Sequence, residues 1–396
     1  MNKEDNLSRL FVFQQSSKGE EFMNKKEVLE VRKQFSPSHC GITRICGCYV
    51  DYEKNIRFRS KDSFLSLPEE EAYKYFDLFK KTLSGTIGKN LLNLNFPLEQ
   101  EMEGGTADFL YRLRNSRLED DTLLEEFYSR VIEHYESADN YYVVLIHGMY
   151  DIPGKGTDNI QVYDASENVY EYILMSINPV SLSEPGLGYD PEVNRIQGRS
   201  RDWLVEGPGA GFLYPAFNDR NQDIHSLLYY MKNPDQLQNN FIKEVFGVEN
   251  LITAKLEREI FQAIVEDSFG DQRDFTTVRN VYEELNDVIL ENKGNPEPVV
   301  LEENDVKIIF ERSGMNESQA EDFQRSFQVI KSTLPNFHAD NVIDSRKFEV
   351  SSPNVVIKVN PERTDLVETR IIDGRKCLVI TVDDFVEVNG IRVNTI

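Results

Sequence analysis

The sequence predicts an α+β protein with a helical N-terminal unit that carries one hairpin, a central and mainly antiparallel sheet, and a C-terminal domain of helices followed by a β-meander. Apolar residues at helical spacing dominate up to residue 137. Segments rich in Val, Ile, Tyr and Phe then alternate with short Gly, Pro and Asp turns up to residue 233. Because these segments follow one another at hairpin distances, we expect antiparallel pairing and not βαβ crossovers.

Residues 1–22 differ in character from the rest of the chain. They show no clear periodicity, whereas a second start-like stretch, "MNKKEVLEVRKQF", opens at Met23 with helical spacing. Lys18-Gly19-Glu20 can be encoded as AAA-GGA-GAA, which contains the purine run of a bacterial ribosome-binding site. We therefore expect Met23 to be the native start and residues 1–22 to be a translated, non-native leader.

Residues 23–137 are expected to form an α-rich unit with one hairpin. Aromatic and β-branched residues fill residues 40–60, which favours two strands joined near Glu53-Lys54-Asn55. Ser66-Leu67-Pro68-Glu69 has the spacing of a capping box and predicts a helix that ends before Gly85. Two further helices are expected, over residues 106–115 and 121–136.

The rest of the chain is expected to contain three more parts. An antiparallel β unit covers residues 138–233, and helical patterning returns over residues 234–292. A linker comes next, over residues 293–300. In the C-terminal α+β domain, residues 301–396, the dipeptides Asp373-Gly374 and Asn389-Gly390 are typical of the type I′ turns of two-residue hairpins.

Charge and composition restrict the partners and the location. The chain of 396 residues has 44 basic and 68 acidic residues, a formal charge of −24 that repels nucleic-acid backbones and anionic membranes. No stretch approaches the roughly 20 apolar residues that span a bilayer. Four cysteines in so long a chain do not make a disulfide framework. We therefore expect a cytoplasmic protein, without a membrane and without a general affinity for nucleic acid.

Candidate metal ligands are grouped in "SPSHCGITRICGCYVD", which contains His39, Cys40, Cys46 and Cys48. Zinc sites usually take two ligands from a C-x2-C turn, which this stretch lacks. In a strand, Cys46 and Cys48 lie on one face about 6.6 Å apart, too far to chelate one ion without bending. Buried strand packing is the favoured interpretation, because free cysteine is among the most buried residue types.

Asp219, Asp223 and His225 are the candidate catalytic residues. They gather in "FNDRNQDIH", after the end of a predicted strand. Carboxylates beside an imidazole can bind a divalent ion or act as an acid–base pair. The competing interpretation is structural, since Asp residues also cap turns and helices.

Four arginines are candidate ligand-binding residues. Arg220 accompanies the two aspartates, and "NPERTDLVETRIIDGRK" gathers Arg363, Arg370 and Arg375 within an otherwise acidic chain. Arginines on a hairpin can bind phosphate or carboxylate. A solvated hairpin with cross-strand ion pairs is the favoured alternative.

Five stretches together resemble one known family, the domain-of-unknown-function family 4317, uncharacterised proteins of low-GC Gram-positive bacteria. They are "ITRICGCYVD", "LSLPEEEAYKYFDLFKKTLSGTIGKNLLNL", "PLEQEMEGGT", "GFLYPAFNDR" and "NPERTDLVETRIIDGRKCLVI". The resemblance runs from Met23 to about Val393, in agreement with a start at Met23. It implies a bacterial source and brings no activity, cofactor or catalytic residue with it.

The residues leave three hypotheses for the function. The chain has no G-x-S-x-G elbow, phosphate-binding loop or C-x-x-C motif, and we expect no cofactor. The leading hypothesis is a non-catalytic interaction or regulatory protein that binds a protein partner or itself through exposed aromatic residues. The alternative is a metal-assisted hydrolase built on Asp219, Asp223 and His225. The third is nucleic-acid or ribosome association through the C-terminal arginines.

Overall fold

The computed structural model describes residues 22–155, 161–162, 168–199, 201–249, 251–293, 298–331 and 334–393. The chain divides into two compact units, Gly19–Thr253 and Ala254–Ile396. The expected α+β class is confirmed, because helices and antiparallel strands occur in both units. Apart from Phe22, the expected leader lies outside the described residues, as do residues 294–297 of the expected linker.

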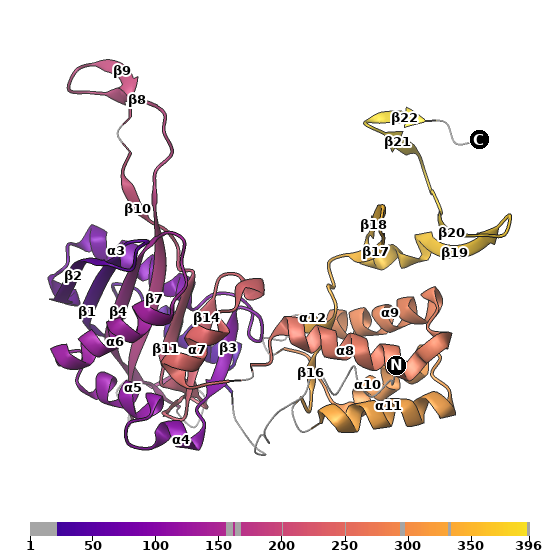
Figure 1. Cartoon of the computed structure of the whole chain (residues 1–396), viewed down its shortest axis with the longest axis horizontal. Helices are drawn as coiled ribbons and strands as arrows, with labels where there is room; N and C mark the ends of the chain where they lie inside the picture. Colours follow the sequence, from indigo (N-terminus) through magenta and orange to yellow (C-terminus); the bar gives the residue numbers. More distant parts are fainter. Residues whose placement is uncertain are drawn as a thin grey trace. The chain divides into compact units, whose positions relative to one another are not determined.

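The N-terminal unit is built on one antiparallel sheet (Figure 1). Its strands lie in the order β2-β1-β4-β7-β11-β14-β3, and β10 pairs with the end of β7. Neighbours in this order are antiparallel throughout. The strands are β1 (Ile42–Val50), β2 (Ile56–Ser63), β3 (Leu91–Asn95), β4 (Asn140–Ile152), β7 (Asn168–Leu182), β10 (Trp203–Val205), β11 (Ala210–Tyr214) and β14 (Ser226–Met231).

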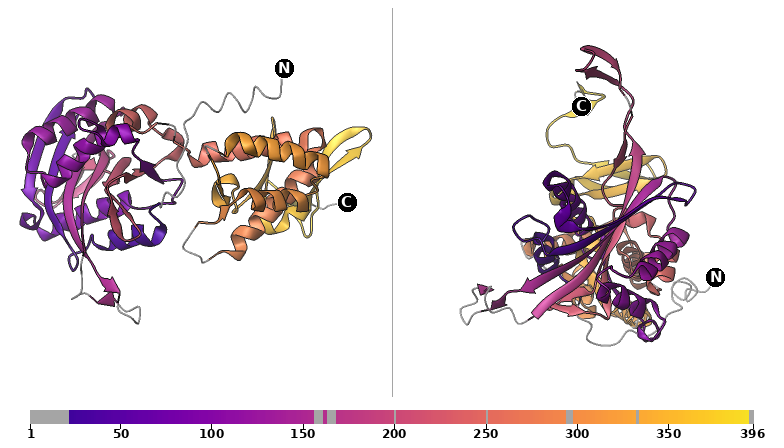
Figure 2. Two further views of the ribbon diagram at one scale, coloured as in Figure 1. Left: turned by 90° about the horizontal axis from the view of Figure 1, so that it is seen from below. Right: turned by 90° about the vertical axis from the view of Figure 1, so that its left-hand side faces the viewer.

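Helices cover both faces of this sheet (Figure 2). One buried cluster joins the sheet to α5, α6 and α7, and a second joins its other face to α2 and α3. Alternation along β4 illustrates the division, since Val143 and Leu145 lie in the first cluster and Val144 and Ile146 in the second. The helices are α2 (Lys25–Lys33), α3 (Glu69–Thr82), α4 (Leu98–Glu101), α5 (Thr106–Asn115), α6 (Asp121–His134) and α7 (Asn239–Phe246).

The sheet unites segments that the sequence analysis assigned to separate parts. Strands β1–β3 come from residues 23–137, and β4, β7, β11 and β14 come from residues 138–233. Similarly, α7 lies in the N-terminal unit, whereas α8 and α9 lie in the C-terminal unit.

Two helix starts show how local chemistry acts here. The side chain of Asn24 accepts hydrogen bonds from the first turn of α2, and the Glu27 carboxylate accepts one from the Asn24 amide, which makes a capping box. The capping box expected at Ser66 is wrong. The Ser66 hydroxyl donates to the Ser63 carbonyl at 2.6 Å instead, and α3 begins after Pro68 without a side-chain cap. Pro68 thus sets the start of α3, because its fixed φ suits the entry to a helix.

An arm extends from the sheet at the end of β7 (Figure 1). We define the arm as β8 (Leu187–Asp190), β9 (Arg195–Gly198) and β10 with their connections. Strands β8 and β9 form a hairpin of their own, and β10 returns the chain to β7. The remaining short strands of this unit are β5 (Gly154–Lys155), β6 (Gln161–Val162), β12 (Ala216–Asn218) and β13 (Asn221–Asp223).

The C-terminal unit has a helical core in which aromatic rings pack together. Phe261 contacts Phe310 and Phe337 edge to face, with ring centroids 5.8 Å and 5.5 Å apart. The elements are α8 (Ala254–Phe269), α9 (Phe275–Glu291), β15 (Val300–Leu301), α10 (Glu303–Arg312), α11 (Glu317–Ile330), β16 (Phe337–His338) and α12 (Ala339–Val342). Among the described residues, no helix of either unit is long and apolar enough to cross a bilayer.

Three hairpins end the chain, each a separate two-stranded sheet. The two turns expected from sequence are confirmed, because Asp373, Gly374, Asn389 and Gly390 all have positive φ, as type I′ requires. The hairpins are β17–β18 (Phe348–Ser352, Val355–Val359), β19–β20 (Val367–Ile372, Arg375–Ile380) and β21–β22 (Val386–Val388, Ile391–Val393).

Candidate functional site

The cysteines expected to be either ligands or packing residues lie on opposite faces of the sheet. Cys46 and Cys48 are buried beneath α6, and burial raises the pKa of Cys46 to about 12 and that of Cys48 to about 11. Cys40 packs against the other cluster, and His39 is exposed beside two serine hydroxyls. Within the part of the chain that the structure describes, no three or more His, Cys, Asp or Glu residues are placed to hold a metal ion.

The side chains of Asp219, Asp223 and His225 do not converge. Asp219 lies in the turn between β12 and β13 with a φ of 45°. One oxygen of Asp223 accepts from the amide of Asn218 at 2.7 Å and from the hydroxyl of Ser226 at 2.6 Å. Its other oxygen accepts from the backbone N–H of His225. This pattern is that of a structural turn carboxylate.

The imidazole of His225 faces a different partner. Its Nδ1 lies 2.8 Å from the carboxylate of Glu101, and the side chain is largely exposed. Arg220 turns the opposite way, onto α2, where its Nη2 lies 2.9 Å from Glu30. Tyr150 donates to the same carboxylate at 2.8 Å. Arg220 therefore holds α2 against the β12–β13 turn.

Two of the C-terminal arginines, Arg363 and Arg370, form ion pairs within their own segment. Arg363 contacts Asp365 at 3.0 Å and Asp383 at 2.6 Å, and Arg370 contacts Glu368 at 2.5 Å. Arg375 lies beside the turn of β19–β20, opposite Ile372. These are not the cross-strand pairs of the solvated hairpin that the sequence analysis favoured, because Glu368 and Arg370 lie on the same strand and Arg363 lies before the hairpin.

One polar arrangement was missed by the sequence analysis. His147 is fully buried, with Nδ1 2.6 Å from the hydroxyl of Thr43 and Nε2 2.9 Å from the carboxylate of Glu171. Arg117 contacts the same carboxylate at 3.2 Å. The register of β1 against β4 shifts between Ile42 and Arg44, so that Thr43 occupies a β-bulge and is exposed.

The protonation of this group follows from its partners. A carboxylate only accepts hydrogen bonds, so we assign the ring proton of His147 to Nε2, and Nδ1 then accepts the Thr43 hydroxyl. Burial lowers the pKa of His147, and its contact with Glu171 opposes that shift. The result is a neutral imidazole aligned as a base for an exposed hydroxyl. A single histidine inside the apolar strand "NYYVVLIHGMYDI" was the signal in the sequence.

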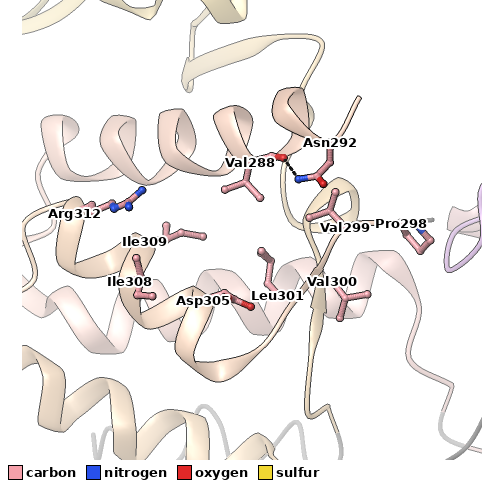
Figure 3. Close-up of a pocket in the computed structure, with 10 residues that line it drawn as sticks. All are labelled: Val288, Asn292, Pro298, Val299, Val300, Leu301, Asp305, Ile308, Ile309 and Arg312. Carbon is pink, nitrogen blue, oxygen red and sulfur yellow. Dashed lines mark hydrogen bonds between the residues drawn. The ribbon is translucent and has the colours of Figure 1, made fainter. Parts of the chain in front are cut away.

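A pocket of about 390 Å³ lies in the C-terminal unit (Figure 3). Its charged groups already have partners, because Asp305 accepts from the Glu302 amide and Arg312 lies 3.2 Å from Glu284. The remaining lining is mainly aliphatic. It consists of Val288, Asn292, Pro298, Val299, Val300, Leu301, Ile308 and Ile309.

An exposed apolar surface of the N-terminal unit lies on the arm. By register, Leu187, Tyr189 and Ile196 lie on one face of β8–β9, and all three are exposed. The opposite face carries Asp190 and Gln197, which are joined by a 2.5 Å hydrogen bond. A hairpin with one apolar and one polar face normally has its apolar face covered.

Comparison with known proteins gives one family and no individual relative. The family model described as "Domain of unknown function (DUF4317)" matches residues 23–391. No curated protein and no solved structure matches the chain.

Proposed function

The chain belongs to the DUF4317 family, and from its surfaces we propose that it is a non-catalytic, cytosolic interaction protein whose arm binds a partner protein with a basic surface. The observation that carries this proposal is the exposed apolar face of β8–β9, on which Leu187 is 79% and Ile196 61% exposed. Exposed apolar patches bordered by polar residues are typical of protein–protein contact sites.

Aromatic residues strengthen the proposal. Trp203 and Tyr189, both exposed, lie on the arm, and tryptophan and tyrosine are enriched among the residues that dominate binding energies. Trp203 pairs with Leu182, and Val205 pairs with Val180. The exposed side chains of Trp203 and Val205 therefore lie on one face of β10, at the base of the arm.

The charge of the chain favours a basic partner. A net charge of −24 attracts positively charged proteins at long range and raises their association rate, and it repels acidic ones. The arm itself carries both signs, with Asp190 and Arg195 directly opposite each other. The net negative charge of the chain therefore attracts the partner at long range, and the apolar face of the arm makes the contact in the bound complex.

The experiment is a capture from a lysate of the native host with three forms of the full chain. Wild type and the control L65E/L98E, whose side chains are as exposed as those on the arm, are expected to recover one basic protein in equimolar amount. The variant L187E/I196E is expected to lose it. Absence of an equimolar partner, or its retention by L187E/I196E, contradicts the proposal.

Hydrolysis is a second candidate, and the Thr43–His147–Glu171 arrangement favours it over the metal-assisted form. In this scheme the Thr43 oxygen attacks an ester carbonyl, and its proton passes to His147 Nδ1. The ester C–O bond breaks, and the leaving group takes that proton from His147 and departs as an alcohol. Water then hydrolyses the acyl group from Thr43, with His147 again as the base. The test is turnover of p-nitrophenyl acetate by wild type, T43V and T43S. Hydrolysis is supported if wild type and T43S turn over the ester and T43V does not. Equal rates in all three proteins contradict it.

A further inference from the structure

The three C-terminal hairpins share one design, in which an apolar face is backed by an ion pair. In β21–β22, Val388 pairs with Ile391 on one face, whereas Glu387 and Arg392 face each other on the opposite side at 3.6 Å. Ile391 is 70% exposed. An apolar face of this kind is normally buried against another surface, since alternation places apolar side chains on the buried side of a sheet.

The other two hairpins repeat the pattern and begin in the core. In β19–β20, Val367 is fully buried and pairs with Ile380, while Ile371, farther along the same face, is 76% exposed. The opposite face carries the Glu368–Arg370 ion pair. The apolar side chains of this face therefore extend from the core into solvent, with Thr369 between them and Lys376 opposite Ile371.

In β17–β18 the buried end is Phe348, whose ring centroid lies 5.0 Å from that of Tyr282 on α9. Val350 and Ile357 pair on the same face, and exposed Val355 follows near the turn. The opposite face pairs Glu349 with Lys358. Two-stranded hairpins are marginal in water by themselves, so three in succession indicate a missing contact.

The local charge distinguishes the possible occupants. Residues 346–393 contain eight acidic and eight basic residues, whereas residues 254–345 contain twenty acidic and nine basic ones. A neutral surface selects neither a basic nor an acidic partner. A neutral surface does allow two copies of this acidic chain, which otherwise repel each other, to come into contact at the hairpins. The ion pairs of the hairpins are formed within each hairpin and need no partner.

We propose that the hairpins of residues 348–393 are a self-association surface, on which a second copy of this chain packs its own apolar hairpin faces. The contact is isologous, the commonest symmetry of soluble oligomers, and its apolar character is that of an obligate homodimer interface. This inference deepens the proposed interaction function by naming one partner, and it uses a surface other than the arm.

The test is the mass of the full chain by sedimentation velocity at micromolar concentration. Wild type is expected at twice 45.9 kDa, and L65E/L98E is expected to keep that mass because its substitutions lie in the other unit. The variant I371E/I391E is expected to sediment as a monomer, with a dissociation constant raised about tenfold or more. Both replaced side chains lie in solvent, so a far-UV spectrum like that of wild type is expected.

Each other result overturns the inference. If wild type is a monomer, the chain does not self-associate. If I371E/I391E remains a dimer, the contact lies outside the hairpins. If L65E/L98E is a monomer, loss of the dimer is not specific to the hairpins. Dissociation of the wild-type dimer in molar NaCl indicates an ionic contact and contradicts an apolar one. A monomer that still captures an equimolar lysate partner leaves the proposed function intact and removes only self-association.

Discussion

His147 and Glu171 face each other across neighbouring strands, with 2.9 Å between the imidazole Nε2 and the carboxylate Oε1. Strand pairing sets His147 opposite Ile173, so that Glu171 is its diagonal neighbour on the same face. The imidazole is fully buried and Glu171 reaches toward solvent, where Arg117 contacts it. A buried histidine is thereby linked to the surface on both sides, through Thr43 and through Glu171.

Acidification is expected to destabilise the N-terminal unit through His147. Burial holds the pKa of His147 below its ordinary value of about 6.5, so the unfolded chain binds the proton more readily. The contribution of His147 to the free energy of unfolding is fully present above about pH 6.5, and it is lost as pH falls through the pKa of His147 in the folded protein. Urea titrations of wild type and H147Q between neutral and mildly acidic pH measure it, and an identical pH dependence in both contradicts the assignment.

His338 in the C-terminal unit is expected to show the opposite dependence. The hydrogen bond to Glu257 raises the pKa of His338, so this contribution is complete below pH 6.5 or so and is lost as pH rises through the folded pKa. Hydrogen exchange of α8 at several pH values, for wild type and H338Q, measures the change within that unit. Protection of α8 that does not fall with rising pH, or that falls equally in H338Q, speaks against it.

T43V is expected to lower the free energy of unfolding by about 1–3 kcal/mol, because the buried Nδ1 of His147 loses its donor while the shape of the side chain is kept. T43S is expected to restore most of the loss. Urea denaturation of the three proteins compares them. A T43V protein as stable as wild type shows that water replaces the hydroxyl.

E257A is expected to destabilise the C-terminal unit by about 3 kcal/mol or more, since the carboxylate is buried and accepts from the Asn341 amide at 2.7 Å and from His338. E259A is the matched control, because it lies on the same helix and is exposed. Thermal unfolding followed by circular dichroism compares the two. Equal melting temperatures argue against the network.

The four thiols are expected to react unequally with an Ellman reagent. In the native protein Cys40 and Cys377, which are partly accessible, react, whereas Cys46 and Cys48 are buried and do not. Burial raises the pKa of Cys40 as well as those of Cys46 and Cys48, so accessibility decides the difference. All four react in guanidinium. Rapid native reaction at Cys46 or Cys48, located by peptide mass spectrometry, contradicts their burial.

Local patterns determined much of the secondary structure. The helix expected over residues 106–115 is α5, and Asn389-Gly390 makes its type I′ turn, because both depend on residues only a few positions apart. Alternation also placed Cys46 and Cys48 on one face before their surroundings were known. At Ser66 a local pattern failed, because α3 begins after Pro68 and the Ser66 hydroxyl donates to the Ser63 carbonyl instead of capping the helix.

Only the tertiary structure decided which polar side chains meet and which segments of the chain belong to one unit. Thr43 and His147 lie 104 positions apart, and Arg220 meets Glu30 across 190 positions. The strand β3, which comes after the helix α3, joins the sheet beside β14 and so unites the two expected N-terminal parts. Sequence periodicity records which face of an element is apolar, since that follows from fixed backbone geometry. It does not record which distant element covers that face, because that depends on packing among many alternatives.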